Sequence, residues 1–209
     1  MHAVKILAGE IKNTLDMYIV AGNIVTYSQA QAYKEAGIDI ARVGVGGGSA
    51  CTTRLQAGVG FPQLSAVFET TETGIYVIAD GGIKQPGDAA KALAAGAGIV
   101  MIGGMFAGTE ETPGEVTGDK KHFRGQASRL YMDDFGVVVN GHRTAEGIST
   151  MVQLAGRVEH VVDNIMGGVK SSMSYVGAHN FKEFQQNAQF VRISDSTQLE
   201  NQPHILNRV

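Results

Sequence analysis

The chain has few of the features that mark secreted, membrane or nucleic-acid-binding proteins. Its single cysteine, Cys51, cannot form an internal disulfide, and we therefore expect a protein of a reducing, cytoplasmic setting. No apolar run approaches the about 20 residues of a membrane span, and the first residues, MHAVKILAGEIK, lack the apolar core of a signal peptide. The formal net charge is only −3 and no basic run interleaves with aromatic residues, so we expect neither a membrane nor a nucleic acid as partner. The six histidines form no metal-ligand pattern.

Glycine, by contrast, is abundant and unevenly placed. The 28 glycines cluster at 44–60, 81–87 and 103–108, which indicates backbone that approaches a ligand rather than flexible linkers. Hydrophobic residues make up 44% of the chain, enough for a substantial core, and the length suits one domain.

The first half of the chain alternates apolar runs with helical segments. A capping box of Thr26 and Gln29 begins one helix, and Pro62 favours the start of another. The apolar runs do not alternate with polar residues, which is typical of parallel strands buried on both faces. We predict strands at 17–25, 38–46, 75–82 and 99–104, and helices within 26–37, 61–72 and 86–98.

Unusual residues follow each predicted strand directly. They are Gly22–Asn23, Gly44–Cys51, Asp80–Gly82 and Gly103–Gly104. Parallel α/β folds bind their ligands at the carboxyl edge of the sheet. The four loops therefore predict one shared site.

The second half of the chain does not continue the alternation of apolar runs and helical segments. Residues 109–150 are polar and lack a clear period, which favours an active-site lid. An amphipathic helix is predicted from the spacing of Val158, Val161, Val162, Ile165 and Met166. A further helix begins at Asn180 with Glu183, the run at 188–193 is expected to be a closing strand, and the tail to Val209 is expected to be extended.

The stretch GVGGGSACTTR, at 44–54, holds the lone cysteine directly behind the richest glycine loop. A phosphate loop, a metal loop and a nucleophile loop share this appearance, and so does a glycine turn beside a small buried cysteine. It is not a dinucleotide fingerprint, because no helix with G-x-G-x-x-G spacing follows.

Several blocks together carry a resemblance. VGVGGGSACTTR, GVGFPQLSAV, VIADGGIKQPGDAAKALAAGA, VMIGGMFAGTEETPGE and GGVKSSMSYVGA closely resemble the IMP dehydrogenase/GMP reductase family over nearly the whole chain. The resemblance implies an α/β fold, a (β/α)8 TIM barrel, in a homo-oligomer that is a tetramer in the family. A full barrel needs about 250 residues, and the resemblance starts at about the fifth strand. We therefore expect 1–209 to be one partial domain, the C-terminal half of the barrel with a lid at 109–150. The first four βα units would be lacking, and we favour truncation over a half-barrel completed by another half or another chain.

The sequence resembles both branches of the family in different blocks. GVGFPQLSAV, GGMFAG, AEGIST and the short lid resemble GMP reductase, and no adjacent Arg-Tyr pair of the dehydrogenase type lies between 124 and 150. The segment GTEETPGE and the tail are more similar to IMP dehydrogenase. We favour NADPH-dependent reduction of GMP to IMP. The alternatives are oxidation of IMP to XMP with NAD, and a purine-nucleotide-binding remnant without turnover.

The resemblance also assigns catalytic roles. Cys51 would bond covalently to purine C2, since a thiolate is a strong nucleophile toward an electron-poor ring carbon. Thr53 and Glu146 would relay a proton to the departing ammonia, because an amino group leaves only when protonated. The alternatives are a buried structural cysteine and a solvated glutamate of the lid.

The remaining residues of the match would hold the nucleotide. Asp80 would bind the ribose hydroxyls. Phe123 stands where many dehydrogenases have a tyrosine that touches phosphate, which puts that contact in doubt. The phosphate would rest on Ser49, Gly82, Gly103 and Gly104.

At the purine edge, Gly125 keeps the family pattern, whereas Gln126 replaces the usual methionine. Arg143 would approach the nucleotide or the cofactor, or is a solvated arginine. Potassium is a further expected ligand, on the carbonyl oxygens of Gly46, Gly48 and Cys51.

Overall fold

A computed structural model of the chain describes residues 2–137, 144–194 and 197. Eight helices of α type, one short 3-10 turn and seven strands lie within these residues. In chain order they are α1 (His2–Thr14), β1 (Val20–Ile24), α2 (Tyr27–Glu35), β2 (Ile40–Val43), α3 (Thr53–Gln56), α4 (Gln63–Thr71), β3 (Tyr76–Asp80), α5 (Pro86–Ala94), β4 (Ile99–Met101), η1 (Gly104–Phe106), β5 (Val116–Thr117), β6 (Lys120–Arg124), α6 (Arg129–Asp134), β7 (Ser149–Gln153), α7 (Val158–Tyr175) and α8 (Phe181–Asn187).

The first four strands form one parallel sheet in the order β1-β2-β3-β4. Ile40 pairs with Val20 on one side and with Tyr76 on the other, and Ile78 pairs with Ile99. The four predicted strands and their parallel arrangement are thereby confirmed, with shorter bounds than the apolar runs. This is an α/β fold. That the sheet is half of a barrel stays a prediction.

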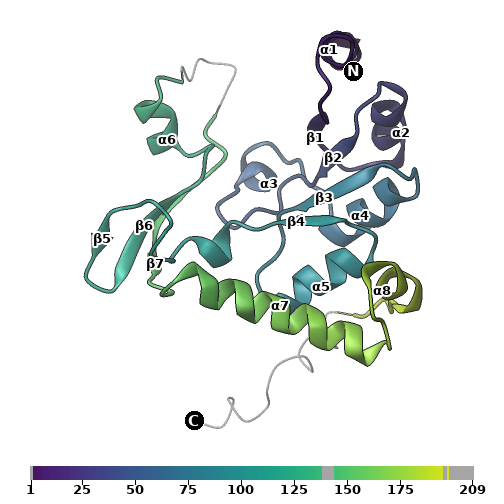
Figure 1. Cartoon of the computed structure of the whole chain (residues 1–209). Coiled ribbons are helices and arrows are strands. Elements are labelled where there is room, and N and C mark those ends of the chain that lie inside the picture. The colour runs from purple at the N-terminus through teal and green to yellow at the C-terminus, as the bar shows by residue number, and fades with distance from the viewer. Residues whose placement is uncertain (1, 138–143, 195–196, 198–209) are drawn as a thin grey trace.

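Local signals set the helices that follow these strands. The Thr26 side chain accepts a hydrogen bond from Gln29 N–H, and the Gln29 side chain accepts one from Thr26 N–H, so the predicted capping box is present. Pro62 caps α4, and Pro86 begins α5. Helices α2, α4 and α5 pack against the sheet, and Figure 1 shows them gathered on one side of it.

Two apolar clusters join these elements. The first fills the space between the sheet and α2 and α4, with Val43, Val67 and Val77 almost fully buried. The second lies where α5 meets α7 and α8, around Leu93 and Ile165. Together they fix the strand ends, and hence the loops that follow them.

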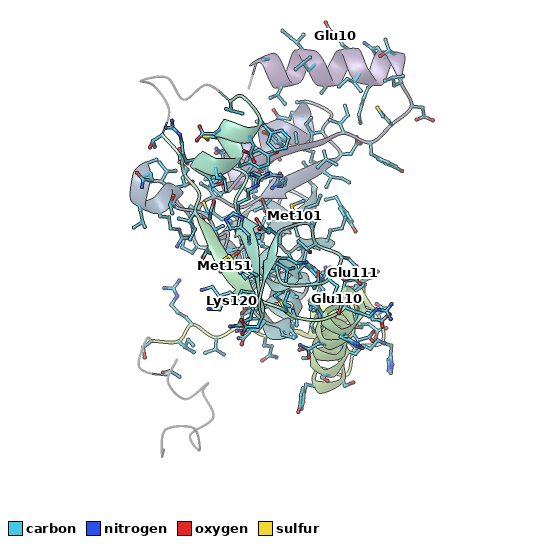
Figure 2. The ribbon with its side chains drawn as sticks, turned by 90° about the vertical axis from the view of Figure 1, so that its left-hand side faces the viewer. Glu10, Met101, Glu110, Glu111, Lys120 and Met151 are labelled. Atoms are coloured by element: carbon cyan, nitrogen blue, oxygen red, sulfur yellow. The ribbon has the colours of Figure 1, made fainter. Side chains whose placement is uncertain are left out.

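The described residues within 109–150 hold strands and a helix that the sequence analysis did not assign. Strands β5, β6 and β7 form an antiparallel sheet, and α6 follows β6. Strand β5 has only two residues and β6 begins with two lysines, which hides the alternation that marks a strand in a sequence. We call β5–β7 the outer sheet. In Figure 1 it forms an arm beside the α/β body, and Figure 2 labels Lys120 and Met151 on it.

A buried lysine holds the base of the outer sheet. Lys121 is 3% exposed, and its ammonium donates to the carbonyl oxygens of Thr109, Glu110 and Thr112, at 2.5, 3.3 and 2.7 Å. These carbonyls belong to the turn that follows η1. Strand β6 is thus tied to the segment that leaves the parallel sheet.

The C-terminal helices also correct the sequence analysis. In α7, Val161 and Ile165 pack inward, but Val162 and Met166 are exposed, so the buried stripe is narrower than predicted and continues to Val169. Asn180 and Glu183 cap α8 as expected.

Residues 188–193 form no strand. The ring of Phe190 instead packs edge-on against Phe68 of α4, with 4.9 Å between centroids, so side-chain packing replaces the expected backbone pairing. The N-terminal helix α1 was not anticipated. None of the helices in the described residues is long and apolar enough to cross a membrane.

Candidate functional site

A cavity of about 290 Å³ opens at the carboxyl ends of the parallel strands. The loops after β2, β3 and β4 form one wall, and residues 123–127 with 146–147 form the other. The predicted site residues that line it are Gly48, Ser49, Cys51, Thr53, Asp80, Gly82, Gly103, Gly104, Phe123, Gly125, Gln126 and Glu146. Gly46 lies in the same glycine loop without lining the cavity, beside Arg54 and Gly60. Arg143 lies outside the described residues.

The glycine loop is held against its neighbours by backbone contacts. Gly82 N–H donates to Gly47 O at 2.8 Å, and Cys51 N–H donates to Gly48 O at 3.1 Å. Gly44 has a φ of +140°, and a Cβ there would overlap the carbonyl oxygen of Asp80. Only glycine accepts both that conformation and that approach, so the loops after β2 and β3 touch through backbone alone.

Three side chains form a chain of hydrogen bonds that joins the two walls of the cavity. Cys51 Sγ donates to Thr53 Oγ1 at 3.2 Å, and Thr53 Oγ1 donates to Glu146 Oε2 at 2.6 Å. A nucleophile, a hydroxyl and a carboxyl group in this order can pass a proton to or from a group bound at the sulfur. The structure thus brings the three predicted catalytic residues together.

Backbone pairing places Glu146 against the cysteine loop. Thr52 N–H donates to Glu146 O at 2.7 Å, and Ile148 N–H donates to Ala50 O at 3.0 Å. Cys51 and Gly147 form an isolated β-bridge between these segments. The carboxyl group is therefore fixed beside the sulfur and does not sit on a solvated loop.

Asp80 ends β3 and is held on one of its two oxygens. Arg42 Nε and Asn23 Nδ2 both donate to Oδ2, at 2.8 and 2.7 Å, and Asn23 Nδ2 also donates to Gly44 O at 2.7 Å. Among the described residues nothing donates to Oδ1, which leaves it for a ligand such as a ribose hydroxyl. Sequence reasoning missed Arg42. Its signal is a single charge inside the apolar strand β2.

The part of the cavity around Ser49 and Gly104 is poor in hydroxyl groups. A Cβ at Gly104 would lie 2.8 Å from Ser49 Oγ, so no side chain fits there beside the serine. Phe123 has no hydroxyl, and the Gly82 N–H is already bonded to Gly47. Ser49, Gly103 and Gly104 remain as the predicted cradle for a small anion.

Two further hollows adjoin this cavity. One, of about 370 Å³, shares Gln126, Ala127 and Glu146 with it. Another, of about 480 Å³, shares Phe123 and Gln126 with the cavity and is lined by Arg124 of β6, Tyr131 of α6 and Phe135 at the end of that helix. Gln126, the residue that departs from the family pattern, thus stands where the three meet.

The described residues contain no group of three or more histidine, cysteine, aspartate or glutamate side chains that would hold a metal ion. Backbone carbonyl oxygens, as in the loop of Gly46, Gly48 and Cys51, suit hard cations. The Gly48 oxygen accepts the Cys51 N–H in this structure.

Comparisons with known proteins agree on one family. A sequence model of the IMP dehydrogenase / GMP reductase domain matches residues 2–204. Inosine-5'-monophosphate dehydrogenases of Aquifex aeolicus and Streptococcus pyogenes are each 44% identical to the chain, over 92% and 89% of its length. A cysteine-to-alanine variant of GMP reductase from Trypanosoma brucei, solved in complex with guanosine 5'-monophosphate, matches with a TM-score of 0.86 and 38% identity over 97% of the chain.

The matches cover less than half of each relative. The aligned part is 42% of the Aquifex protein, 41% of the Streptococcus protein and 44% of the Trypanosoma chain. The two dehydrogenases and the reductase carry the names of two different activities.

Proposed function

The chain belongs to the IMP dehydrogenase/GMP reductase family of purine-nucleotide oxidoreductases, and from that premise we propose that it reduces GMP to IMP with NADPH. The observation that carries the proposal is the hydrogen-bonded series Cys51–Thr53–Glu146 at the cavity wall. It supplies both a nucleophile for purine C2 and a proton for the group that leaves C2. The GMP in the Trypanosoma neighbour supports a purine nucleotide as ligand.

The reaction assigns one task to each of these residues. Cys51 Sγ, as thiolate, forms a bond to C2 of the guanine ring. Glu146 in its acid form passes a proton through Thr53 to the C2 amino group, whose bond to carbon then breaks to release ammonia. NADPH supplies the hydride that takes its place at C2. The sulfur–carbon bond breaks last, returning the thiolate and IMP, so that GMP, NADPH and two protons give IMP, NADP⁺ and ammonium.

Other groups would bind and orient the nucleotide for these steps. Asp80 Oδ1 would accept from the ribose, Gly125 and Gln126 would meet the purine edge, and the phosphate would lie against Ser49 and Gly103–Gly104. A nicotinamide would fit in the hollow of about 370 Å³, because Gln126, Ala127 and Glu146 join that hollow to the reacting end of the cavity. A potassium ion would take carbonyl oxygens of Gly46, Gly48 and Cys51.

The choice of reductase rests on the residues that follow β6. Oxidation of IMP to XMP requires an activated water, and no adjacent Arg-Tyr pair lies between 124 and 150. The second candidate is nonetheless IMP dehydrogenase with NAD, favoured by the names of the curated relatives at 44% identity. A third is nucleotide binding without turnover. We also propose that the four-stranded sheet is the C-terminal half of a barrel, which the TM-score of 0.86 over 44% of the neighbour supports.

One pair of assays separates these candidates. The protein is incubated with GMP and NADPH, and separately with IMP and NAD, while the absorbance of reduced nicotinamide is followed. We expect loss of NADPH with GMP and no NADH with IMP. NADH formation with IMP alone would overturn the reductase assignment, and binding of GMP without turnover in either assay would favour the remnant. Cys51→Ala should abolish turnover and retain nucleotide binding; full turnover in this variant would remove the nucleophile assignment.

A further inference from the structure

The charged side chains that line the cavity differ in whether they have a hydrogen-bonding partner. Three titratable side chains with formal charge line it: Asp80, Glu146 and Lys84. Asp80 is paired with Arg42, and Glu146 is engaged by Thr53. Among the described residues, no group accepts a hydrogen bond from the Lys84 ammonium. The Lys84 side chain is therefore a cation without an acceptor at a site that we propose binds an anion.

The backbone of Lys84 is anchored, although its exposed ammonium has no hydrogen-bond acceptor among the described residues. Asp88 Oδ2 accepts from Lys84 N–H at 3.1 Å and from Gln85 N–H at 3.2 Å, in the capping box that begins α5. The Asp88 carboxylate is thereby used by the backbone. Lys84 also follows Gly82 by two residues, and Gly82 is bonded to Gly47 of the glycine loop. The side chain thus leaves from the segment that touches the serine end of the cavity.

That end offers little else to a phosphate. Ser49 supplies a hydroxyl, but Phe123 has none and Gly104 has no side chain. A nucleoside monophosphate carries close to two negative charges near neutral pH, since its second pKa is about 6. Burying such a group with one hydroxyl and backbone amides leaves its charge uncompensated, whereas a charge-assisted hydrogen bond from an ammonium is among the strong contacts for phosphate.

We propose that Lys84 binds the 5'-phosphate of the nucleotide and sets the preference of the site for nucleoside monophosphates over nucleosides. The inference rests on the proposed binding of a purine nucleotide in this cavity, and it does not depend on which reaction follows. Lys84 is a binding residue and takes no part in the chemistry at C2.

The test compares nucleotides with a nucleoside on charge-matched variants. Calorimetry measures GMP and IMP, and ligand-observed NMR measures inosine at millimolar concentration, on the wild type, Lys84→Gln, Lys84→Arg and Lys91→Gln. Lys91 is an exposed lysine of α5 that does not line this cavity, and it controls for net charge. We expect Lys84→Gln to weaken both nucleotides about tenfold and leave inosine unchanged. Lys84→Arg and Lys91→Gln should bind nucleotides nearly as the wild type does.

A second readout uses salt. Raising the salt concentration from about 50 to about 200 mM should weaken nucleotide binding more in the wild type than in Lys84→Gln. Equal nucleotide affinity in the wild type and Lys84→Gln would overturn the inference, and so would an equal loss for inosine. If the wild type binds both nucleotides but turns over neither, the proposed reaction fails while the binding comparison still decides the role of Lys84. If the wild type binds no nucleotide, both fail.

Discussion

The Thr53 hydroxyl donates a hydrogen bond of 2.6 Å to Glu146 Oε2, across 93 positions of the chain. Thr53 begins α3, directly behind the glycine loop, and Glu146 precedes β7 of the outer sheet. The contact therefore joins the two sheets at the point where Cys51 lies. The proposed reaction, which needs the sulfur and a proton together, depends on this contact.

The first prediction concerns this contact. Thr53→Val and Glu146→Gln each should lower kcat for the proposed reaction by about 10²–10⁴-fold, because the leaving amino group loses its proton donor. KM for the nucleotide should change little, since neither group is placed at the phosphate or the ribose. Steady-state kinetics measure both parameters. Thr53→Ser keeps the hydroxyl and should retain most of the activity; a loss as large as that of Thr53→Val would mean that the hydroxyl is not the working group.

A second prediction concerns Gly44. Gly44→Ala should lower the free energy of unfolding by about 2–4 kcal/mol, because the backbone conformation disfavours a side chain and the new Cβ meets the Asp80 carbonyl. Nucleotide binding should fall with it, since the loops after β2 and β3 separate. Denaturant unfolding and calorimetry measure these effects. Gly87→Ala is the matched control in α5, where a Cβ meets nothing within 4 Å and the helix gains stability. Similar values for both variants would contradict the close-approach argument.

The buried Lys121 supplies a third prediction. Lys121→Met should cost about 2 kcal/mol or more of unfolding free energy, because the carbonyls of Thr109 and Thr112 lose their donor inside the protein. The neighbouring Lys120 is exposed, and Figure 2 labels it on the outer sheet, so Lys120→Met is the control. Chemical denaturation of both variants measures the difference. Equal stability of the two would show that the ammonium contributes nothing to the base of the outer sheet.

The fourth prediction is a dependence on pH. Glu111 Oε2 accepts the Val158 N–H at 2.8 Å at the start of α7, and this hydrogen bond lowers the pKa of the Glu111 carboxyl. Figure 2 labels Glu110 and Glu111 beside this helix. A carboxyl whose pKa is lower in the folded state stabilises that state above its unfolded pKa of about 4.3, and the contribution is lost as the pH falls through the folded value.

Glu111→Gln should therefore lose less stability than the wild type between about pH 5 and pH 3. Denaturant midpoints across this range measure the two slopes. Glu110→Gln removes the same formal charge from the adjacent position and serves as the control for net charge. Parallel slopes for the wild type and Glu111→Gln would refute the capping role.

The parallel sheet was predictable because its signals are local. Apolar runs, the capping pair of Thr26 and Gln29, and the proline of α5 each act within a few residues of one strand or helix. The meeting of three of the four strand-end loops also followed from topology, since parallel strands share a carboxyl edge. Cys51 and Asp80 could be placed in one site on that ground. The fourth expectation was wrong, because Gly22 and Asn23 lie within β1 and do not line the cavity.

Contacts between residues far apart in the sequence could not be predicted in this way. Strand β6, KKHFR, has no apolar alternation, and its pairing with β7 depends on residues about 30 positions later. The run at 188–193 has the composition of a strand, yet Phe190 packs on Phe68 instead. The role of Arg42 is visible only from its ion pair with Asp80 on the next strand. The proposed role of Lys84 is visible only from its position in the cavity lining.

The division of the candidate site between two sheets has a consequence for how the proposed enzyme would change during evolution. The proposed nucleophile and phosphate cradle lie on the loops of the parallel sheet, whereas Glu146 and the proposed purine-edge residues lie beside the strands of the outer sheet. The residues proposed to bind the nucleotide and those proposed to act on its covalent adduct therefore lie on separate segments of the chain. Under the proposed function, substitutions around β5–β7 would change the reaction that follows attack at C2, while the loop of Gly44–Cys51 could stay as it is.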